Sequence, residues 1–215
     1  MPTLGKTSFE LERIFRLLNN RFYGGELEKP IIAVQTTGKK SAYGWCTTRR
    51  IWTDSKNEQA AYYEITMTAE YLTRPNEQIV STLLHEMAHL YSLQNGMKDT
   101  SRGCTYHNKT FKLVAESHGL TIEHDDKIGW SVSTLNGEAL EYMSELKVNR
   151  QAFRIARQAA APKGTGKVKQ SMRKYICPLC GMTVRATKAV HVVCGDCMMT
   201  METEDGESGA ELMAV

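Results

Sequence analysis

Hydrophobic residues recur every three or four positions in the first part of the chain, which predicts a helix with one buried face. The positions of this face are Leu11, Ile14, Phe15, Leu18 and Phe22. Thr7 and Glu10 fit a capping box at the start of the helix, in which each side chain binds the backbone of the other residue. We expect Gly24 and Gly25 to end the helix.

Three later segments, 31–35, 43–51 and 61–68, are rich in β-branched and aromatic residues and predict strands. A second helix is predicted from Pro75, a residue favoured in a first helical turn, to about Leu93. The apolar stripe of this helix comprises Val80, Leu83, Leu84, Met87, Leu90 and Tyr91.

The pattern then becomes less regular. A mostly polar loop over 96–106 leads to a short predicted helix over 108–118, which Gly119 is expected to close. Residues 121–135 have the composition of an extended or irregular segment. A further helix is predicted over 138–160.

Together these elements predict an α+β domain over residues 1–160. Gly, Pro and Lys dominate residues 161–172, which indicates a basic linker. A small module follows over 173–199, and an acidic tail over 200–215. The part of the tail from 202 to 215 has five acidic residues and no basic one, so we expect it to be disordered.

The candidate chemistry of the second helix lies in the segment HEMAH at 85–89, an H-E-x-x-H motif. A spacing of four residues places both imidazoles on one helix face, where they can share a metal ion. The apolar stripe lies on the other side of the helix, so the histidines point toward a cleft. The motif therefore predicts zinc ligands at His85 and His89, with Glu86 as the general base.

A catalytic zinc ion usually has three protein ligands and keeps its fourth position for water. His107 is the best candidate for the third ligand, because a helix-loop-helix hairpin can return it to the motif. His118 and His124 are the competing histidines, and Glu116 is the alternative for a carboxylate ligand. A metzincin arrangement is excluded, because its third histidine would fall at Asn95.

Two C-x-x-C pairs occupy the small module, and 13 residues separate them. The pairs are Cys177 with Cys180 and Cys194 with Cys197. Each turn presents two thiolates to one metal ion, and two turns complete a closed tetrahedral zinc site. The module is therefore predicted to be a zinc ribbon whose metal supplies most of its folding energy.

The composition, with 41% hydrophobic and 24% charged residues, is that of a globular protein. The chain contains neither an apolar run of the ~18–20 residues that a membrane span requires nor an N-terminal secretory signal. We therefore expect no membrane partner and an intracellular location, in the cytoplasm or at the nucleoid or nucleus. The remaining thiols, Cys46 and Cys104, are expected to be at least partly buried, although Cys104 is close enough to His107 in sequence to approach its metal.

Between Lys147 and Lys174 the chain has nine basic residues and no acidic ones. In the predicted helix, Lys147, Arg150, Arg154 and Arg157 recur at three- and four-residue steps and would share one face. A solvated face and a phosphate-binding surface both account for such a run, and the adjoining zinc ribbon favours phosphate.

The motif, the loop and the segment HNKTF at 107–111 together resemble the SprT-like family, which includes the Spartan proteases of eukaryotes. The segment LLNNRFYGGEL at 17–27 also resembles a segment of this family. The order of the helices, strands and motifs resembles that of the family over most of residues 8–197. Members often have glycine directly after the third histidine, where this chain has Asn108. The resemblance implies a zincin-like domain, in which His107 is the third ligand, with a C-terminal zinc ribbon.

The function implied is a zinc metallopeptidase with one catalytic and one structural zinc ion, acting on protein substrates. Relatives in eukaryotes cut proteins crosslinked to DNA, so DNA-associated substrates are expected by analogy, with DNA bound through the basic helix, the linker and the zinc ribbon. Tyr106 and Arg102 are candidate oxyanion donors only by their closeness to His107. The alternatives are a nucleic-acid-binding zinc protein with a structural or inactive histidine site, and a zinc hydrolase of small amides.

Overall fold

A computed structural model describes residues 1, 3–36, 42–158 and 172–203. The contacts divide the chain into two units, Met1–Ala159 and Ala160–Val215, and each is described by itself. The predicted linker, apart from Met172, lies outside the described residues, as does the tail from 204 onward.

Helix α1 spans Leu4–Phe22 and begins earlier than the sequence predicted. Thr3 is its N-cap residue, and the Thr3 hydroxyl oxygen accepts a hydrogen bond from the Lys6 N–H. The chain reverses just after the helix, at Gly24 and Gly25, whose φ angles of 62° and 80° suit glycine.

The capping box predicted from Thr7 and Glu10 is wrong. Both residues lie within α1 rather than at its start, and their buried side chains form hydrogen bonds with a segment distant in sequence. Thr7 Oγ1 donates to the carbonyl of Ala152 (2.6 Å), and Glu10 Oε1 accepts from the Asn149 N–H (2.8 Å). They fasten the short 3₁₀ helix η2, Arg150–Phe153, to α1.

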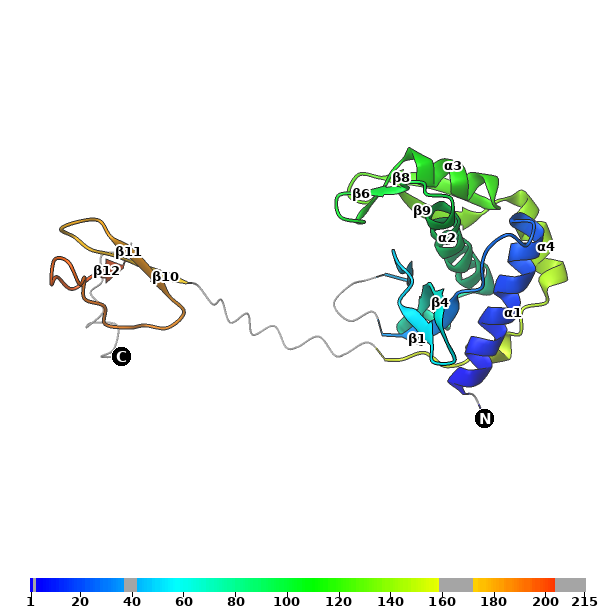
Figure 1. Cartoon of the computed structure of the whole chain (residues 1–215), viewed down its shortest axis with the longest axis horizontal. Helices are drawn as coiled ribbons and strands as arrows, with labels where there is room; N and C mark the ends of the chain where they lie inside the picture. The colour runs from blue at the N-terminus through cyan, green and yellow to red at the C-terminus, as the bar shows by residue number, and fades with distance from the viewer. Residues whose placement is uncertain (2, 37–41, 159–171, 204–215) are drawn as a thin grey trace. The chain divides into compact units, whose positions relative to one another are not determined.

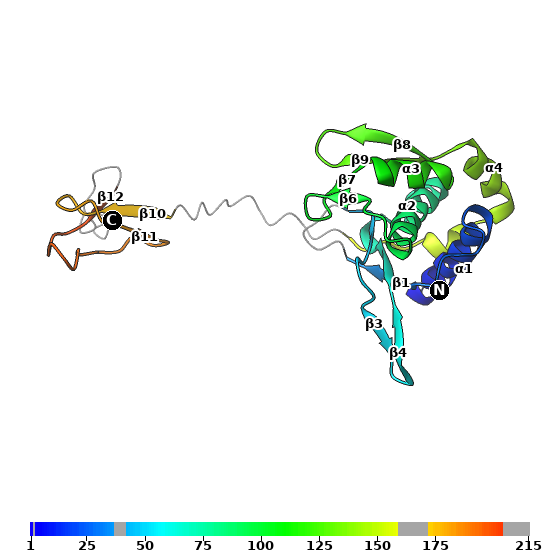
Figure 2. The same ribbon diagram turned by 45° about the horizontal axis from the view of Figure 1, so that its top comes forward.

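The first sheet has the strand order β1-β5-β2. Strand β5 (Glu64–Thr68) is central and buried at every position. Strand β1 (Ile31–Gln35) pairs with it in parallel, and β2 (Gly44–Cys46) pairs antiparallel on the other side. Strands β3 (Trp52–Asp54) and β4 (Asn57–Tyr62) form a separate hairpin, which projects from the domain in Figure 2.

The strand boundaries differ from the prediction. Of the segment 43–51, only residues 44–46 form a strand, and the segment 61–68 is divided at Tyr63 between β4 and β5. Strand β3 was missed because it is short and mostly exposed and has no apolar alternation that a pattern could detect.

Helix α2 spans Asn76–Gln94, and Pro75 is its N-cap residue rather than part of its first turn. Its buried residues surround most of the helix instead of forming one stripe. The reason is that the first sheet packs on one side of α2, and β9 with the short helix α3 packs on the other (Figure 1).

The second sheet has the strand order β6-β7-β9-β8. Its strands are β6 (Thr100–Ser101), β7 (Tyr106–His107), β8 (Leu120–Asp125) and β9 (Gly129–Leu135). The segment predicted as extended or irregular is therefore the β8–β9 hairpin, and the polar loop contains two short strands. Helix α3, Lys109–Ser117, follows β7 directly.

The single helix predicted over 138–160 is wrong. Helix α4 covers only Gly137–Leu146, and Lys147 adopts a left-handed backbone with φ of 44°. Arg13 Nη2 donates to the carbonyls of Leu146 (3.0 Å) and Lys147 (3.3 Å). These hydrogen bonds satisfy two carbonyl groups at the C-terminal end of α4. The basic residues therefore do not share a helix face, and Arg157 instead lies 3.3 Å from a carboxylate oxygen of Glu70.

The C-terminal unit contains a three-stranded sheet in the order β11-β10-β12. Its strands are β10 (Arg173–Ile176), β11 (Thr183–Ala186) and β12 (Glu202–Thr203). Disorder was expected from residue 202, but β12 pairs with β10, and Met201 beside it is buried. The described structure thus extends beyond the predicted end of the module at 199.

Candidate active site and metal centres

Three histidines from two parts of the first unit meet at one point. His85 and His89 come from α2, and His107 comes from β7. The Nε2 atom of His107 lies 3.2 Å from that of His85 and 3.1 Å from that of His89. The sequence motif and the distant histidine therefore form one group of possible metal ligands.

The spacing of the three rings fits a zinc ion. Zn–N bonds of about 2.0–2.1 Å in tetrahedral geometry separate ligand nitrogens by about 3.3 Å, close to the observed values. Each ring also has a partner at Nδ1, which leaves Nε2 directed inward. The three pairs are His85 with Ser133 Oγ (2.6 Å), His89 with Asp99 Oδ2 (2.7 Å) and His107 with the Ile128 carbonyl (3.2 Å).

The surroundings of His85 and His107 favour the neutral form of these two imidazoles. Burial lowers the pKa of His85 well below its usual value, and the two neighbouring imidazoles lower it further. Burial and the proximity of His89 lower the pKa of His107 to about 4. Because a metal binds the neutral ring, the site is prepared for a cation near neutral pH.

Glu86 follows His85 on α2, and its side chain is buried beside the three rings. Burial raises the pKa of Glu86 to about 7, although nearby His89 and a hydrogen bond from the Cys46 backbone N–H act in the opposite direction. A carboxyl group with this pKa can exchange a proton near neutral pH, as a general base requires.

A cleft opens over these residues. Strand β2 borders it on one side, and β9 and the loop 96–105 border it on the other. Gly44 allows β2 to approach α2, since a Cβ at this position would lie 2.8 Å from the Thr66 carbonyl oxygen and 3.3 Å from Glu86 Cγ. The close approach brings the Cys46 N–H to Glu86.

The other candidate ligands lie elsewhere. The ring of His118 stacks on that of Tyr23, with 4.1 Å between centroids, and His124 Nε2 lies 3.1 Å from the Tyr106 hydroxyl. Glu116 lies 3.8 Å from Lys112 Nζ. The hydroxyl of Tyr106, a candidate oxyanion donor, is directed to His124.

Arg102 and Cys104 line the cleft in the loop before β7. The Arg102 guanidinium lies over the Tyr106 ring, 4.5 Å from its centroid. The Cys104 thiol is exposed and does not join the three imidazoles within the part of the chain that the structure describes. Neither side chain is therefore brought to the candidate metal position.

Two residues of this site were missed from the sequence, namely Asp99 and Ser133. Asp99 lies in the polar loop before His107, and Ser133 lies in β9. An acidic residue in that loop was the one available signal, because a histidine ligand usually has a carboxylate, carbonyl or water at its other nitrogen.

Asn108 explains the departure from the glycine often found after the third histidine. It is the N-cap residue of α3, and its side-chain oxygen accepts hydrogen bonds from the N–H groups of Thr110 (2.7 Å) and Phe111 (3.2 Å). Phe111 is thereby positioned with its ring 4.5–4.7 Å from the three imidazole centroids. Its apolar ring closes the side of the site that faces the core.

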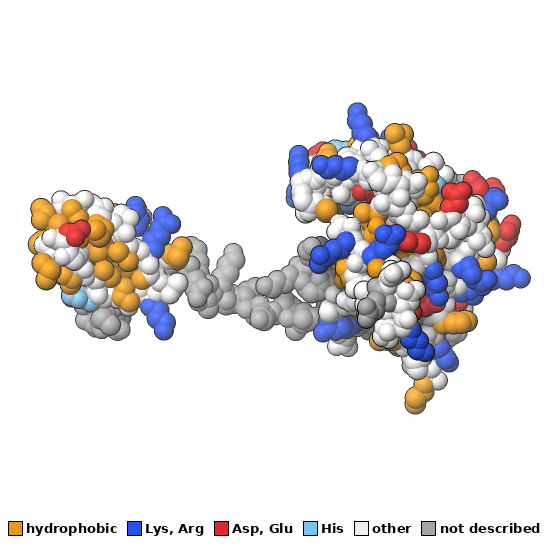
Figure 3. All heavy atoms as spheres, in the orientation of Figure 1, with side chains coloured by type: hydrophobic (Ala, Val, Ile, Leu, Met, Phe, Trp, Pro, Cys, Tyr) orange, Lys and Arg blue, Asp and Glu red, His pale blue; other side chains and the backbone are white. Residues whose placement is uncertain are grey.

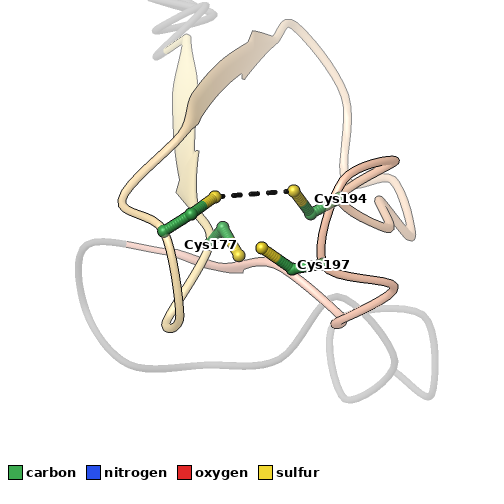
Figure 4. A group of neighbouring side chains, drawn as sticks. Cys177, Cys194 and Cys197 are labelled. Carbon is green, nitrogen blue, oxygen red and sulfur yellow. Dashed lines mark hydrogen bonds between the residues drawn. The ribbon is translucent and has the colours of Figure 1, made fainter.

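The four cysteines of the C-terminal unit also converge. Their sulfur atoms all lie within 4.8 Å of one another, and Figure 4 shows Cys177, Cys194 and Cys197 directed toward a common point. Cys177 accepts hydrogen bonds from the N–H groups of Cys180 and Leu179, which lower the pKa of its thiol to about 7. This arrangement fits a closed tetrahedral zinc site.

The two cysteine turns have the same backbone design. Gly181 N–H donates to the Cys177 carbonyl (2.9 Å), and Met198 N–H donates to the Cys194 carbonyl (2.8 Å). Both donors have left-handed backbones, with φ of 73° and 53°. The two turns therefore present their thiols with the same local backbone geometry.

These features define a zincin-like domain with an H-E-x-x-H helix, joined to a unit with a four-cysteine cluster. Residues 11–126, more than half of the chain, match the model of the SprT-like family, and the chain belongs to this family. The match ends before the four cysteines of the C-terminal unit. Their interpretation as a candidate zinc site therefore rests on their own geometry. A search among curated proteins gives no match. No helix in the described ranges is long and apolar enough to cross a membrane.

Proposed function

We propose that the chain is a zinc-dependent metallopeptidase that cleaves protein substrates. The observation that carries this proposal is the convergence of three imidazoles beside the buried carboxyl of Glu86, at the floor of an open cleft. Membership of the SprT-like family supports it.

His85, His89 and His107 would hold the catalytic zinc ion. In such a site, zinc lowers the pKa of a water molecule and polarises the scissile carbonyl. Glu86 accepts a proton from the attacking water and donates it to the leaving amine. Asp99 and Ser133 hold the rings in the orientation that these steps require.

The edge of β2 favours a polypeptide over a small amide. Among the described residues this strand pairs only with β5. Thr68 N–H donates to the Tyr43 carbonyl and Thr47 N–H donates to the Glu64 carbonyl, so the backbone groups of Gly44 between them face the cleft side. An extended peptide can add to such an edge as a further strand.

Replacing Glu86 by glutamine tests the proposal. The variant should keep its zinc but lose about 10²–10⁴-fold in the rate of peptide cleavage, because its amide cannot accept the proton. Glu77→Gln is the matched control, since this exposed carboxylate lies on the same helix and in the same cleft. Equal cleavage by wild type and Glu86→Gln would remove Glu86 from the mechanism.

We propose that the four cysteines hold a second, structural zinc ion. Metal analysis should then give about two zinc ions per chain, one for each cluster. His107→Ala should lose the first and Cys177→Ser the second. Loss of both ions from either single variant, or one ion in wild type, would contradict the division of roles.

We also propose that the C-terminal unit binds DNA, which would direct cleavage to DNA-associated proteins. Lys174 and Arg185 lie directly opposite each other in the β10–β11 register, so two basic side chains lie side by side on this sheet, as in a phosphate-binding surface. Figure 3 shows Lys and Arg side chains on the surface of this unit.

The DNA proposal has a test of its own. Affinity for DNA should fall steeply with salt, and Arg185→Gln should reduce the salt slope by about one. Binding that is absent or independent of salt would remove this proposal and leave the peptidase intact. DNA binding without any peptide cleavage would instead favour a nucleic-acid-binding protein with an inactive histidine site.

A further inference from the structure

Arg74 is a fixed cation in the cleft that contains Glu86. Its side chain is half-buried and held on three sides. Nε donates to the Tyr71 carbonyl (3.0 Å), Nη2 donates to the Thr82 hydroxyl (3.0 Å), and the guanidinium carbon lies 4.0 Å from the centroid of the Tyr43 ring. A guanidinium has five N–H donors, so these contacts leave several directed elsewhere.

No carboxylate of the described residues lies within ion-pair distance of Arg74. Four other arginines of the same unit have glutamate partners: Arg13, Arg21, Arg50 and Arg157. Glu77 lines the same cleft without pairing with Arg74. Burial lowers the pKa of Arg74, and the groups that act against this effect are the phenols of Tyr43 and Tyr71 rather than a carboxylate. Within the described part of the chain, a half-buried cation is therefore left without a carboxylate partner inside a cleft, where an anionic ligand would compensate it.

Arg74 lies close to the candidate reaction centre at Glu86, because it is bonded to the same helix one turn earlier. Thr82, to which its guanidinium is bonded, lies one helical turn before Glu86, a rise of about 6 Å along α2. The strand β2 passes over both residues, since a Cβ at Gly44 would lie 3.2 Å from Thr82 Cγ2 and 3.3 Å from Glu86 Cγ. A peptide extended along β2 advances about 3.3 Å per residue. Arg74 is thus one to three residues from the bond at Glu86.

We propose that Arg74 is a specificity-determining residue, which binds a carboxylate of the substrate one to three residues from the scissile bond. This inference rests on the proposed peptidase function and adds a preference to it. The carboxylate can belong to an acidic side chain or to the C-terminus of the substrate, and both fit the planar fork of the guanidinium.

Peptide binding to the zinc-loaded Glu86→Gln protein separates recognition from cleavage. Fluorescent peptides with an amidated C-terminus carry either glutamate or glutamine at each of three positions on both sides of the central bond. A further peptide has no acidic side chain but a free C-terminus. We expect at least one glutamate peptide, or the free C-terminus, to bind about tenfold or more tightly than its neutral match.

The preference should disappear in Glu86→Gln/Arg74→Gln and be reduced in Glu86→Gln/Arg74→Lys, which keeps the charge without the fork. Arg50→Gln is the control in the same background, because Arg50 also lies over a tyrosine ring, that of Tyr63, but already pairs with Glu28. The measured quantity is the ratio of the affinities of each charged peptide and its neutral match. A general loss of affinity through lost packing leaves this ratio unchanged, so it cannot be mistaken for a lost preference. If Arg74→Gln does not fold, the Arg74→Lys ratio decides.

Equal binding of all matched peptides, or a preference that survives in Arg74→Gln, would overturn the inference. Cleavage by the wild type is scored separately with the same peptides. Cleavage without an Arg74-dependent preference removes the inference and keeps the peptidase, whereas a preference in binding without any cleavage removes the peptidase and keeps the anion subsite.

Discussion

Asp99 is predicted to control the affinity of the three-histidine site for zinc. Its carboxylate lies 2.7 Å from His89 Nδ1, and the side chains of Asp99 and His89 are only 10% and 14% exposed. A charge-assisted hydrogen bond at this distance and burial orients the ring and makes Nε2 a stronger ligand. Asp99→Asn preserves the shape of the side chain and removes the charge.

The expected loss is about 10–100-fold in zinc affinity, the range found when such partners are removed. This corresponds to about 1.4–2.7 kcal/mol. Ser133→Ala removes a neutral hydrogen bond to His85 (2.6 Å), which contributes about 0.5–1.5 kcal/mol, so the loss should be smaller, about 2–12-fold. The order of the two variants is therefore part of the prediction.

The assay is a competition titration of the metal-free full chain with a chromogenic zinc chelator. The four-cysteine cluster should give a separate phase that neither variant changes, which serves as an internal reference. Asp126→Asn is the matched control, because Asp126 Oδ1 faces His124 Nδ1 at 3.8 Å on the surface. Unchanged zinc affinity in Asp99→Asn, or a larger loss in Ser133→Ala, would refute the reasoning.

Three further predictions concern pH, packing and capping. In the metal-free chain, stability should rise with pH between about 4 and 6.5 because the pKa of His107 is lowered, whereas the raised pKa of Glu86 opposes this rise between about 4.5 and 7. Metal-free Glu86→Gln should therefore show a steeper increase of Tm from pH 5 to 6.5 than wild type, and equal slopes would contradict this. Gly44→Ala should destabilise the chain by about 1–3 kcal/mol in urea unfolding and reduce cleavage with zinc retained, because the new methyl group meets the Thr66 carbonyl; full activity would count against it. Asn108→Ala should cost about 1 kcal/mol and Asn108→Gly only a few tenths, and no loss of stability in Asn108→Ala would show that the side-chain cap contributes nothing.

Local patterns predicted some elements well and others poorly. The helix carrying His85 and His89 was predicted almost to its ends, because its caps and its apolar residues are close in sequence. The capping box at Thr7 and the helix over 138–160 failed for one common reason. Glu10, Thr7 and Arg13 bind the segment 146–152, and such a pairing between distant segments leaves no mark in a local pattern.

The same contrast holds for the metal centres. A spacing of four on a helix by itself brings two imidazoles together, and each C-x-x-C turn by itself brings two thiols together, because the covalent geometry of a single turn is enough. The sequence also made His107 the best candidate for the third ligand, but its position alone favoured it only moderately over His118 and His124.

Only the tertiary structure shows how His107 reaches the other two imidazoles and which neighbours orient its ring. The Ile128 carbonyl accepts both the backbone N–H (2.9 Å) and the ring Nδ1–H (3.2 Å) of His107, which turns Nε2 toward α2. This contact requires β7 to lie beside β9, and only a glycine allows it at residue 129, where a Cβ would lie 2.2 Å from the His107 carbonyl oxygen. Asp99 reaches the same centre from the loop between the two ligand segments, and Ser133 reaches it from a strand that is remote in sequence. Their convergence depends on the packing of both sheets against α2, which no spacing along the chain encodes.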